Sequence, residues 1–146
     1  MTPVSTRPSY KTFVVERPVA APRANVWAAI VDLVSSGGYV VEGDPAPHGP
    51  GATTTFRLGG RDLVERVLSF EPPWRRCYEI VSGAPVRLYQ GTITLRDDGA
   101  RCLLVWSYLC DPGDDPEAEA FLAAVQQVLR GAAERAAVAA EAAAVG

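Results

Sequence analysis

One acidic side chain in the segment DLVERVLSF, residues 62–70, is the first candidate for chemistry in this sequence. Alternate residues give the segment two faces, and each face carries one charge among apolar neighbours, Glu65 on one and Arg66 on the other. In a half-buried strand, one face points into the core. A carboxylate in a core is costly unless it is paired, and it is also suited to move a proton or hold a ligand. The direction of Glu65 therefore decides whether the chain has a polar site.

The other residue types that often carry chemistry form no recognisable motif. His48 is the only histidine and lies in the Gly/Pro-rich loop 43–51, where we expect an exposed side chain. Cys77, Cys102 and Cys110 are odd in number and lack C-x-x-C spacing, so we expect buried apolar side chains rather than a disulfide framework or a zinc site. No phosphate-binding loop, dinucleotide fingerprint or nucleophile elbow occurs. The sequence thus predicts neither a cofactor nor a metal ion.

Length and composition favour one globular domain. The chain has 146 residues, of which 48% are hydrophobic and 21% charged. We expect a flexible arm at 1–10 and a single domain at 11–146. The net charge of −3 argues against nucleic-acid binding, and no apolar run approaches the roughly 18 residues of a membrane span. The N-terminus lacks the apolar stretch of a secretory signal, so we expect a cytoplasmic protein, and the Arg- and Ala-rich composition is typical of GC-rich bacteria.

Turn signals divide the chain into strands and two helices. Apolar spacing predicts a first helix at 23–34 and a long last helix that begins near Asp115. The predicted strands lie at 11–17, 39–42, 52–58, 61–71, 75–82, 86–97 and 100–110. Because only turn signals separate the last five strands, we expect an antiparallel meander.

The turns also predict which residues face each other. A two-residue turn at Asp98-Gly99 pairs Gly91 with Trp106 and Tyr89 with Tyr108 on one face. Going back one strand, Tyr78 then faces Gly91, which makes room for the Trp106 ring. A four-residue loop after Phe70 pairs Phe70 with Arg75, Val67 with Tyr78, and Glu65 with Ile80.

Opposite charges support this register. It sets Arg66 opposite Glu79 and Arg57 opposite Asp62, and we expect both ion pairs on the outer face. Glu65 then points inward, opposite Thr54 on the preceding strand. Three roles remain open for it: a buried carboxylate hydrogen-bonded to a tyrosine or to the threonine, a ligand anchor or acid–base group, or a carboxylate in water at a cavity mouth.

Several segments resemble the START-like helix-grip superfamily (SRPBCC), and within it the polyketide cyclase/dehydrase and lipid-transport branch. They include VVERPVAAPRANVWAAIVDL at 14–33, GATTTFRLGGRDLVERVLSFEPPWRRCYEIVSG at 51–83 and YQGTITLRDDGARCLLVWSYL at 89–109. The P-x-x-V-W helix start, the F-x-P-P turn and the D-G hairpin with its tryptophan are fold motifs rather than catalytic signatures. The resemblance implies an α+β fold in which a curved antiparallel sheet of six to seven strands wraps around the long C-terminal helix, in the order β-α-β(5–6)-α.

The resemblance also implies a cavity for a hydrophobic molecule between the sheet and the last helix. Ordinary core packing is the alternative role for the same side chains. Arg76 has the parity of Tyr78, and we expect it in solvent, with a place at the cavity end as the alternative. The residues expected to line the cavity are Phe56, Leu63, Glu65, Val67, Tyr78, Ile80, Tyr89, Ile93, Leu104, Trp106, Tyr108, Phe121, Val125 and Val128.

We therefore expect a non-catalytic protein, a monomer or homodimer, that binds or transports a small hydrophobic molecule such as a lipid, a quinone or a polyketide-like aromatic. The first alternative is a polyketide cyclase or dehydrase that uses the same cavity, with Glu65 as the candidate catalytic residue. The second is a protein-interaction module.

Overall fold

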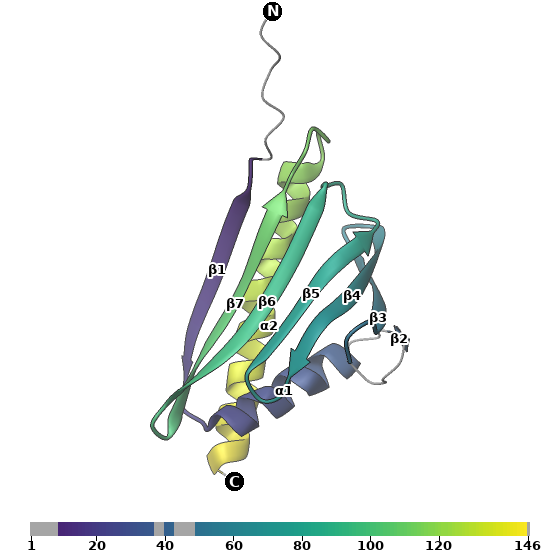
Figure 1. Cartoon of the computed structure of the whole chain (residues 1–146). Coiled ribbons are helices and arrows are strands. Elements are labelled where there is room, and N and C mark those ends of the chain that lie inside the picture. The colour runs from purple at the N-terminus through teal and green to yellow at the C-terminus, as the bar shows by residue number, and fades with distance from the viewer. Residues whose placement is uncertain (1–8, 37–39, 43–48, 146) are drawn as a thin grey trace, which may run out of the picture.

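The computed structural model of the protein describes residues 9–36, 40–42 and 49–145 and shows an α+β fold (Figure 1). Its elements are β1 (Lys11–Val19), α1 (Arg23–Ser36), β2 (Val40–Glu42), β3 (Thr53–Leu58), β4 (Arg61–Glu71), β5 (Arg75–Ser82), β6 (Leu88–Asp98), β7 (Arg101–Asp111) and α2 (Ala118–Val145). The predicted order of elements is confirmed. Most of the predicted arm at 1–10 and the loop residue His48 lie outside the described residues.

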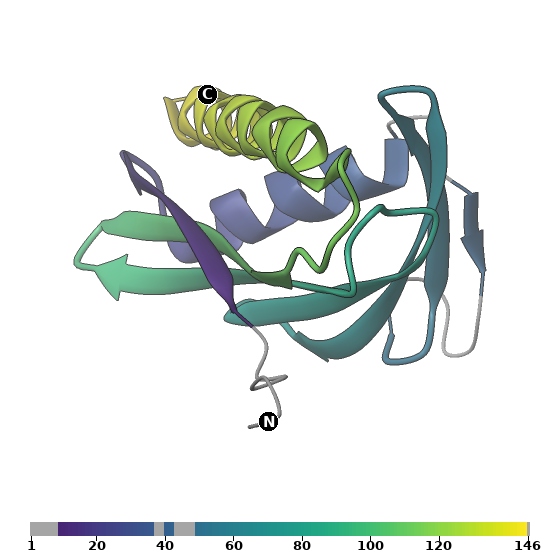
Figure 2. The same ribbon diagram turned by 90° about the horizontal axis from the view of Figure 1, so that it is seen from above.

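All seven strands join one antiparallel sheet in the order β1-β7-β6-β5-β4-β3-β2. The first strand therefore pairs with the last one, while the remaining strands follow one another as a meander. Both helices lie on the same face of this sheet, and the sheet bends toward them on the side of β3 and β4 (Figure 2). This is the predicted helix-grip arrangement.

The long helix α2 lies closer to one half of the sheet than to the other. Its main contacts are with β1, β7 and α1. Alanines in its second half are buried, which lets its backbone approach α1 closely. The sheet half formed by β3, β4 and β5 stands further from the helix axis, so the space there must be filled by long side chains or remain open.

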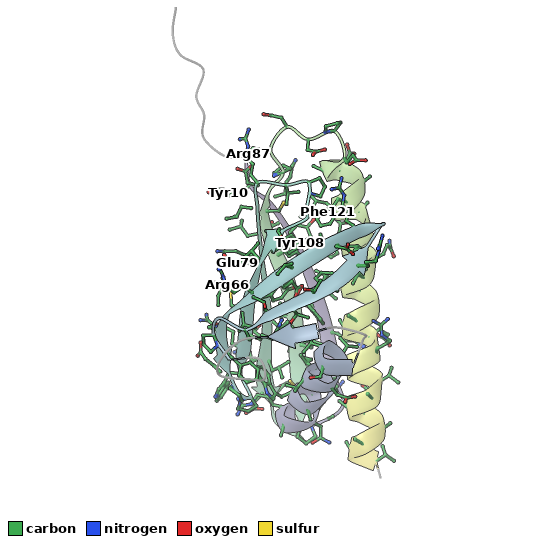
Figure 3. The ribbon with its side chains drawn as sticks, turned by 90° about the vertical axis from the view of Figure 1, so that its right-hand side faces the viewer. Tyr10, Arg66, Glu79, Arg87, Tyr108 and Phe121 are labelled. Carbon is green, nitrogen blue, oxygen red and sulfur yellow. The ribbon has the colours of Figure 1, made fainter. Side chains whose placement is uncertain are left out.

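The register between β4 and its neighbours confirms the predicted inward direction of Glu65. Glu65 pairs with Thr54 on β3 and with Ile80 on β5. Arg66 pairs with Glu79 on the outer face, where its Nε lies 3.2 Å from the Glu79 carboxylate. Figure 3 shows this ion pair on the side of the sheet away from α2, whereas Tyr108 and Phe121 lie between sheet and helix.

The predicted pairing at the end of β4 is wrong. Phe70 pairs with Arg76 instead of Arg75, because a bulge falls between Val67 and Ser69 and the turn that follows is one residue shorter than predicted. The bulge turns Phe70 inward, where its ring packs 5.4 Å from that of Trp27. The shift is confined to the end of β4, so Glu65 and Val67 at its centre keep their predicted partners and their inward direction.

The hairpin between β6 and β7 also differs from the prediction, by a shift of two residues. Its turn is formed by Gly99 and Ala100 rather than by Asp98 and Gly99, and Gly99 has a φ of 65°. A shift of two residues preserves the faces. It does change the partners, since Gly91 lies opposite Tyr108 instead of Trp106. The space above Gly91 belongs to the Tyr78 ring, whose Cζ would lie 2.1 Å from a Cβ at this position.

Arg17 on β1 forms ion pairs with the C-terminal half of α2. Its Nε lies 2.9 Å from the Glu134 carboxylate, and its Nη1 lies 3.1 Å from that of Glu141. The Ala20 amide also donates to Glu141, at 3.0 Å. The Arg17 hydrogen bonds hold the pKa values of both carboxyl groups below their usual range.

We expect Arg17→Met to lower the Tm by about 2–4 °C at neutral pH. A lowered pKa means that the carboxylates stabilise the fold above their unfolded pKa of 4.5 and lose this contribution as the pH falls through the folded value. The difference in Tm between variant and wild type should therefore shrink below about pH 4.5. Thermal unfolding followed by circular dichroism measures it.

Arg57→Met is the matched control, because Arg57 and Asp62 form a largely exposed pair 3.5 Å apart. It should change the Tm by about 1 °C or less at every pH. Equal effects of the two substitutions would show that the Arg17 contacts do not stabilise the fold.

Candidate functional site

A pocket of about 320 Å³ lies between α2 and the half of the sheet formed by β3, β4 and β5, and the end of α1 closes one side. Its walls are mainly apolar, and its polar members come from β3, β4, β5, β6 and α2. It is lined by Leu33, Val34, Thr54, Phe56, Leu58, Leu63, Glu65, Arg76, Tyr78, Ile80, Tyr89, Trp106, Val125, Val128, Leu129, Ala132 and Arg135. The pocket occupies the region where the curved sheet stands away from α2.

Nine of the fourteen residues that the sequence singled out line this pocket. They are Phe56, Leu63, Glu65, Tyr78, Ile80, Tyr89, Trp106, Val125 and Val128. The other five, which are buried but do not line it, are Val67, Ile93, Leu104, Tyr108 and Phe121. Leu104 and Tyr108 lie on β7, which α2 covers directly.

Sequence reasoning missed several wall residues, for different reasons. Leu58 lies two residues after Phe56 on β3, so both side chains point to the same face of the sheet. The alternation of the strand could therefore have identified Leu58 as a wall residue. Leu129 and Ala132 continue the apolar stripe of α2. Leu33 and Val34 gave no such signal, because the sequence does not show which side of α1 meets the sheet.

Glu65 is the only carboxylate among the described residues that line the pocket. Its side chain is half-buried, because its carboxylate faces the pocket while protein surrounds the rest of it. Burial raises the pKa of Glu65 to about 7, and the positive charge of Arg76 opposes this rise. No hydrogen bond or ion pair from Glu65 occurs within the described residues, so the bond to a tyrosine or to Thr54, one of the three roles left open for Glu65, is absent there. Its proton is therefore gained or lost in the neutral pH range.

Arg76 lies beside Glu65 in the wall, and its position corrects our expectation of a solvated side chain. Only 2% of the residue is exposed. Its guanidinium lies 4.9 Å from the centre of the Tyr78 ring, a cation–π contact. Its Nε is buried with no hydrogen-bond partner within the described residues. The bulge in β4 explains the burial, because Phe70 pairs with Arg76 and brings its ring to the inner face.

Aromatic side chains form the floor of the pocket. The Trp106 indole donates to the Tyr78 hydroxyl oxygen at 3.0 Å. Tyr89 packs between Tyr78 and Tyr108, with ring centres 6.4 and 5.2 Å away. Burial raises the pKa of both Tyr78 and Tyr89 well above that of a free phenol. These hydroxyls therefore stay protonated and act as hydrogen-bonding groups at physiological pH.

A second hollow lies at the start of α2, against β1 and the end of β7. There Gln126 Nε2 donates to the Tyr108 hydroxyl at 3.1 Å. Neither Glu65 nor Arg76 lines this hollow.

The part of the chain that the structure describes offers no cluster of three or more residues suited to hold a metal ion. None of its helices combines the length and apolarity required to cross a membrane.

The sequence model of one family, described as polyketide cyclase/dehydrase and lipid transport, matches residues 11–144. The chain belongs to this family. A comparison with curated proteins finds no match. The resemblance inferred from the fold motifs is thus confirmed, and the family description agrees with a site for a hydrophobic ligand.

Solved structures of other proteins share the fold of this polyketide cyclase/dehydrase family member, although their sequences are distant. A solution structure from Thermobifida fusca is 26% identical, covers 86% of this chain and 92% of its own, and has a TM-score of 0.66. A norcoclaurine synthase mutant from Thalictrum flavum, in complex with a transition-state analogue, is 16% identical over 93% of this chain and 97% of its own, with a TM-score of 0.72. Ara h 8.0201 is 16% identical over 90% and 98%, with a TM-score of 0.71.

Proposed function

We propose that the protein binds a small hydrophobic molecule in the pocket between α2 and strands β3 to β5. The observation that carries the proposal is an apolar pocket in which a few polar groups, Glu65 and Arg76 among them, lie close together. Ligand sites commonly combine apolar walls, which supply affinity, with a few polar groups that orient the ligand. Burial of apolar ligand surface contributes about 25 cal/mol per Å².

The volume of the pocket limits the size of the ligand. At 320 Å³ it lies near the lower end of the range for small-molecule sites. It corresponds to the space of about ten water molecules in the liquid. A one- or two-ring aromatic body fits this volume, whereas a lipid with two long acyl chains would exceed it.

The binding proposal is tested by native mass spectrometry of the purified protein, together with solvent extraction and analysis of any bound molecule. Thermal shift against a panel of one- and two-ring aromatics gives a second readout. Binding predicts a co-purified molecule or a reproducible rise in Tm. The absence of both would contradict the proposal.

Filling the pocket should remove binding without unfolding the protein. Ala132 faces the pocket from α2, so Ala132→Phe places a ring in the ligand volume and should weaken binding at least about tenfold. Ala139→Phe is the matched control, because Ala139 is an exposed alanine of the same helix. Isothermal titration calorimetry on both variants measures the effect. Equal affinity in the two variants would place the ligand elsewhere.

A second candidate function is cyclisation or dehydration of a polyketide-like substrate in the same pocket. The observation that favours it is the pKa of Glu65, which at about 7 suits a general acid or base. A norcoclaurine synthase of the same fold shows that this architecture can hold a synthase. Glu65→Gln should then abolish turnover and spare binding, and unchanged turnover would remove Glu65 from the mechanism.

A further inference from the structure

The buried guanidinium of Arg76 gives the pocket a positive charge that the protein itself does not neutralise. Within the described residues Arg76 forms no ion pair, its Nε has no hydrogen-bond partner, and its cation–π contact with Tyr78 leaves the charge in place. A buried charge is costly unless a counter-charge and hydrogen-bond acceptors accompany it. An arginine suits a carboxylate especially well, because its planar fork donates two parallel hydrogen bonds.

The remaining charged and titratable groups of the pocket leave this charge in excess. They are Glu65 on β4, Tyr78 on β5, Tyr89 on β6 and Arg135 on α2, while the wall residues from α1, β3 and β7 are neutral. Arg135 adds a second positive charge at the exposed rim and forms no ion pair within the described residues. Both tyrosines are protonated. Against these two cations, the described part of the wall offers one carboxylate, whose pKa is raised toward neutrality by burial.

We propose that the ligand of this pocket is a small aromatic or other apolar acid, whose carboxylate is held by Arg76 while its ring lies against Tyr78, Tyr89 and Trp106. The proposal rests on the binding function proposed above and specifies the chemical class of its ligand. The apolar body would occupy the volume below α2, and the charged end would supply the acceptors that the guanidinium lacks.

Glu65 makes this binding depend on pH. Below pH 7 the group is mostly neutral, so the pocket is positive and favours an anion. As the pH rises through the pKa of Glu65, its carboxylate becomes charged, attracts Arg76 and repels the ligand. Affinity for a carboxylate ligand should therefore fall with rising pH, although the ligand itself stays fully ionised over this range.

A matched pair of probes separates this proposal from the binding function. The probes are 2-naphthoate and 2-naphthamide, which have nearly the same shape but differ in charge. Isothermal titration calorimetry at about pH 6 should show naphthoate binding at least about tenfold more tightly than naphthamide. If both probes bind with affinities within about twofold, the pocket is a binding site but the acid proposal is overturned. If neither probe binds, the binding function itself is contradicted.

The variants identify the residue that holds the carboxylate. Arg76→Met should weaken naphthoate binding at least about tenfold and change naphthamide binding less than about threefold. Arg75→Met, a change of the neighbouring exposed arginine, should leave both affinities unchanged. Arg76→Lys keeps the charge but not the fork, so it should fall between wild type and Arg76→Met, and it supplies the test if the methionine variant fails to fold. Unchanged naphthoate binding in a folded Arg76 variant would overturn the proposal.

The pH arm tests Glu65 separately. From about pH 6 to about pH 8 the affinity of the wild type for naphthoate should fall about three- to tenfold. Glu65→Gln should remove this dependence, while the affinity for naphthamide should be independent of pH in both proteins. The same pH dependence in the Glu65→Gln protein would exclude Glu65 as its source.

Discussion

Gly91→Ala is expected to lower the free energy of unfolding by about 3 kcal/mol, although it adds a single methyl group. A Cβ at this position would lie 2.1 Å from Cζ and 2.3 Å from the hydroxyl oxygen of Tyr78. The Tyr78 ring is itself buried beneath the pocket, so it cannot move without disturbing its neighbours. Its displacement would also break the hydrogen bond from Trp106, which is worth about 1 kcal/mol. Urea unfolding followed by circular dichroism gives the change.

A double-mutant cycle shows whether the clash with Tyr78 is the cause. Tyr78→Leu removes the ring atoms that the new methyl group would meet. In that background Gly91→Ala should cost less than about 1 kcal/mol, so the two substitutions should couple by about 2 kcal/mol. An equal cost of Gly91→Ala in both backgrounds would show that the constraint lies in the backbone of β6 instead.

Arg76→Met is expected to have the opposite sign and to raise the free energy of unfolding by about 1–2 kcal/mol in the absence of ligand. The substitution removes a buried charge that has no ion-pair partner within the described residues. Replacing buried charged groups by apolar ones of similar size is often stabilising by about 1–4 kcal/mol. The lost cation–π contact with Tyr78, worth about 1 kcal/mol, offsets part of the gain. A residue kept at the expense of stability is typical of a functional site.

The neighbouring arginine provides the control for this prediction. Arg75 is exposed and lies 3.2 Å from the Glu71 carboxylate, so Arg75→Met should change the free energy of unfolding by less than about 0.5 kcal/mol. Denaturant unfolding of the two variants, in protein freed of bound molecules by refolding, makes the comparison. A clear loss of stability in Arg76→Met would mean that the guanidinium has a structural partner.

The fold and the direction of Glu65 could be predicted because both depend on local signals. Turn residues mark the strand ends, and the Arg66–Glu79 and Arg57–Asp62 pairs identify the outer face. The exact partners were less predictable where a turn could close at either of two adjacent positions. At the β6–β7 hairpin, Asp98 pairs with Arg101 although the Asp-Gly signal placed it within the turn.

The burial of Arg76 could not be predicted, because it depends on contacts between distant segments. Its position after a Pro-Pro turn is typical of an exposed strand end. In the fold, the bulge in β4 turns Phe70 onto Trp27 of α1, and these rings shield the end of β5 that carries Arg76. The shape of the pocket is equally non-local, since it follows from α2 packing on β1 and β7 rather than on the centre of the sheet.

Trp106, whose indole donates a hydrogen bond to Tyr78, gives the pocket an intrinsic fluorescent reporter. Of the three tryptophans, Trp106 alone lines the pocket, Trp27 is buried against Phe70, and Trp74 is half-exposed at the turn before β5. A molecule that enters the pocket meets the Trp106 ring and changes the polarity around its indole. Fluorescence of a protein in which the other two tryptophans are replaced by phenylalanine would thus follow occupancy directly, without any attached label.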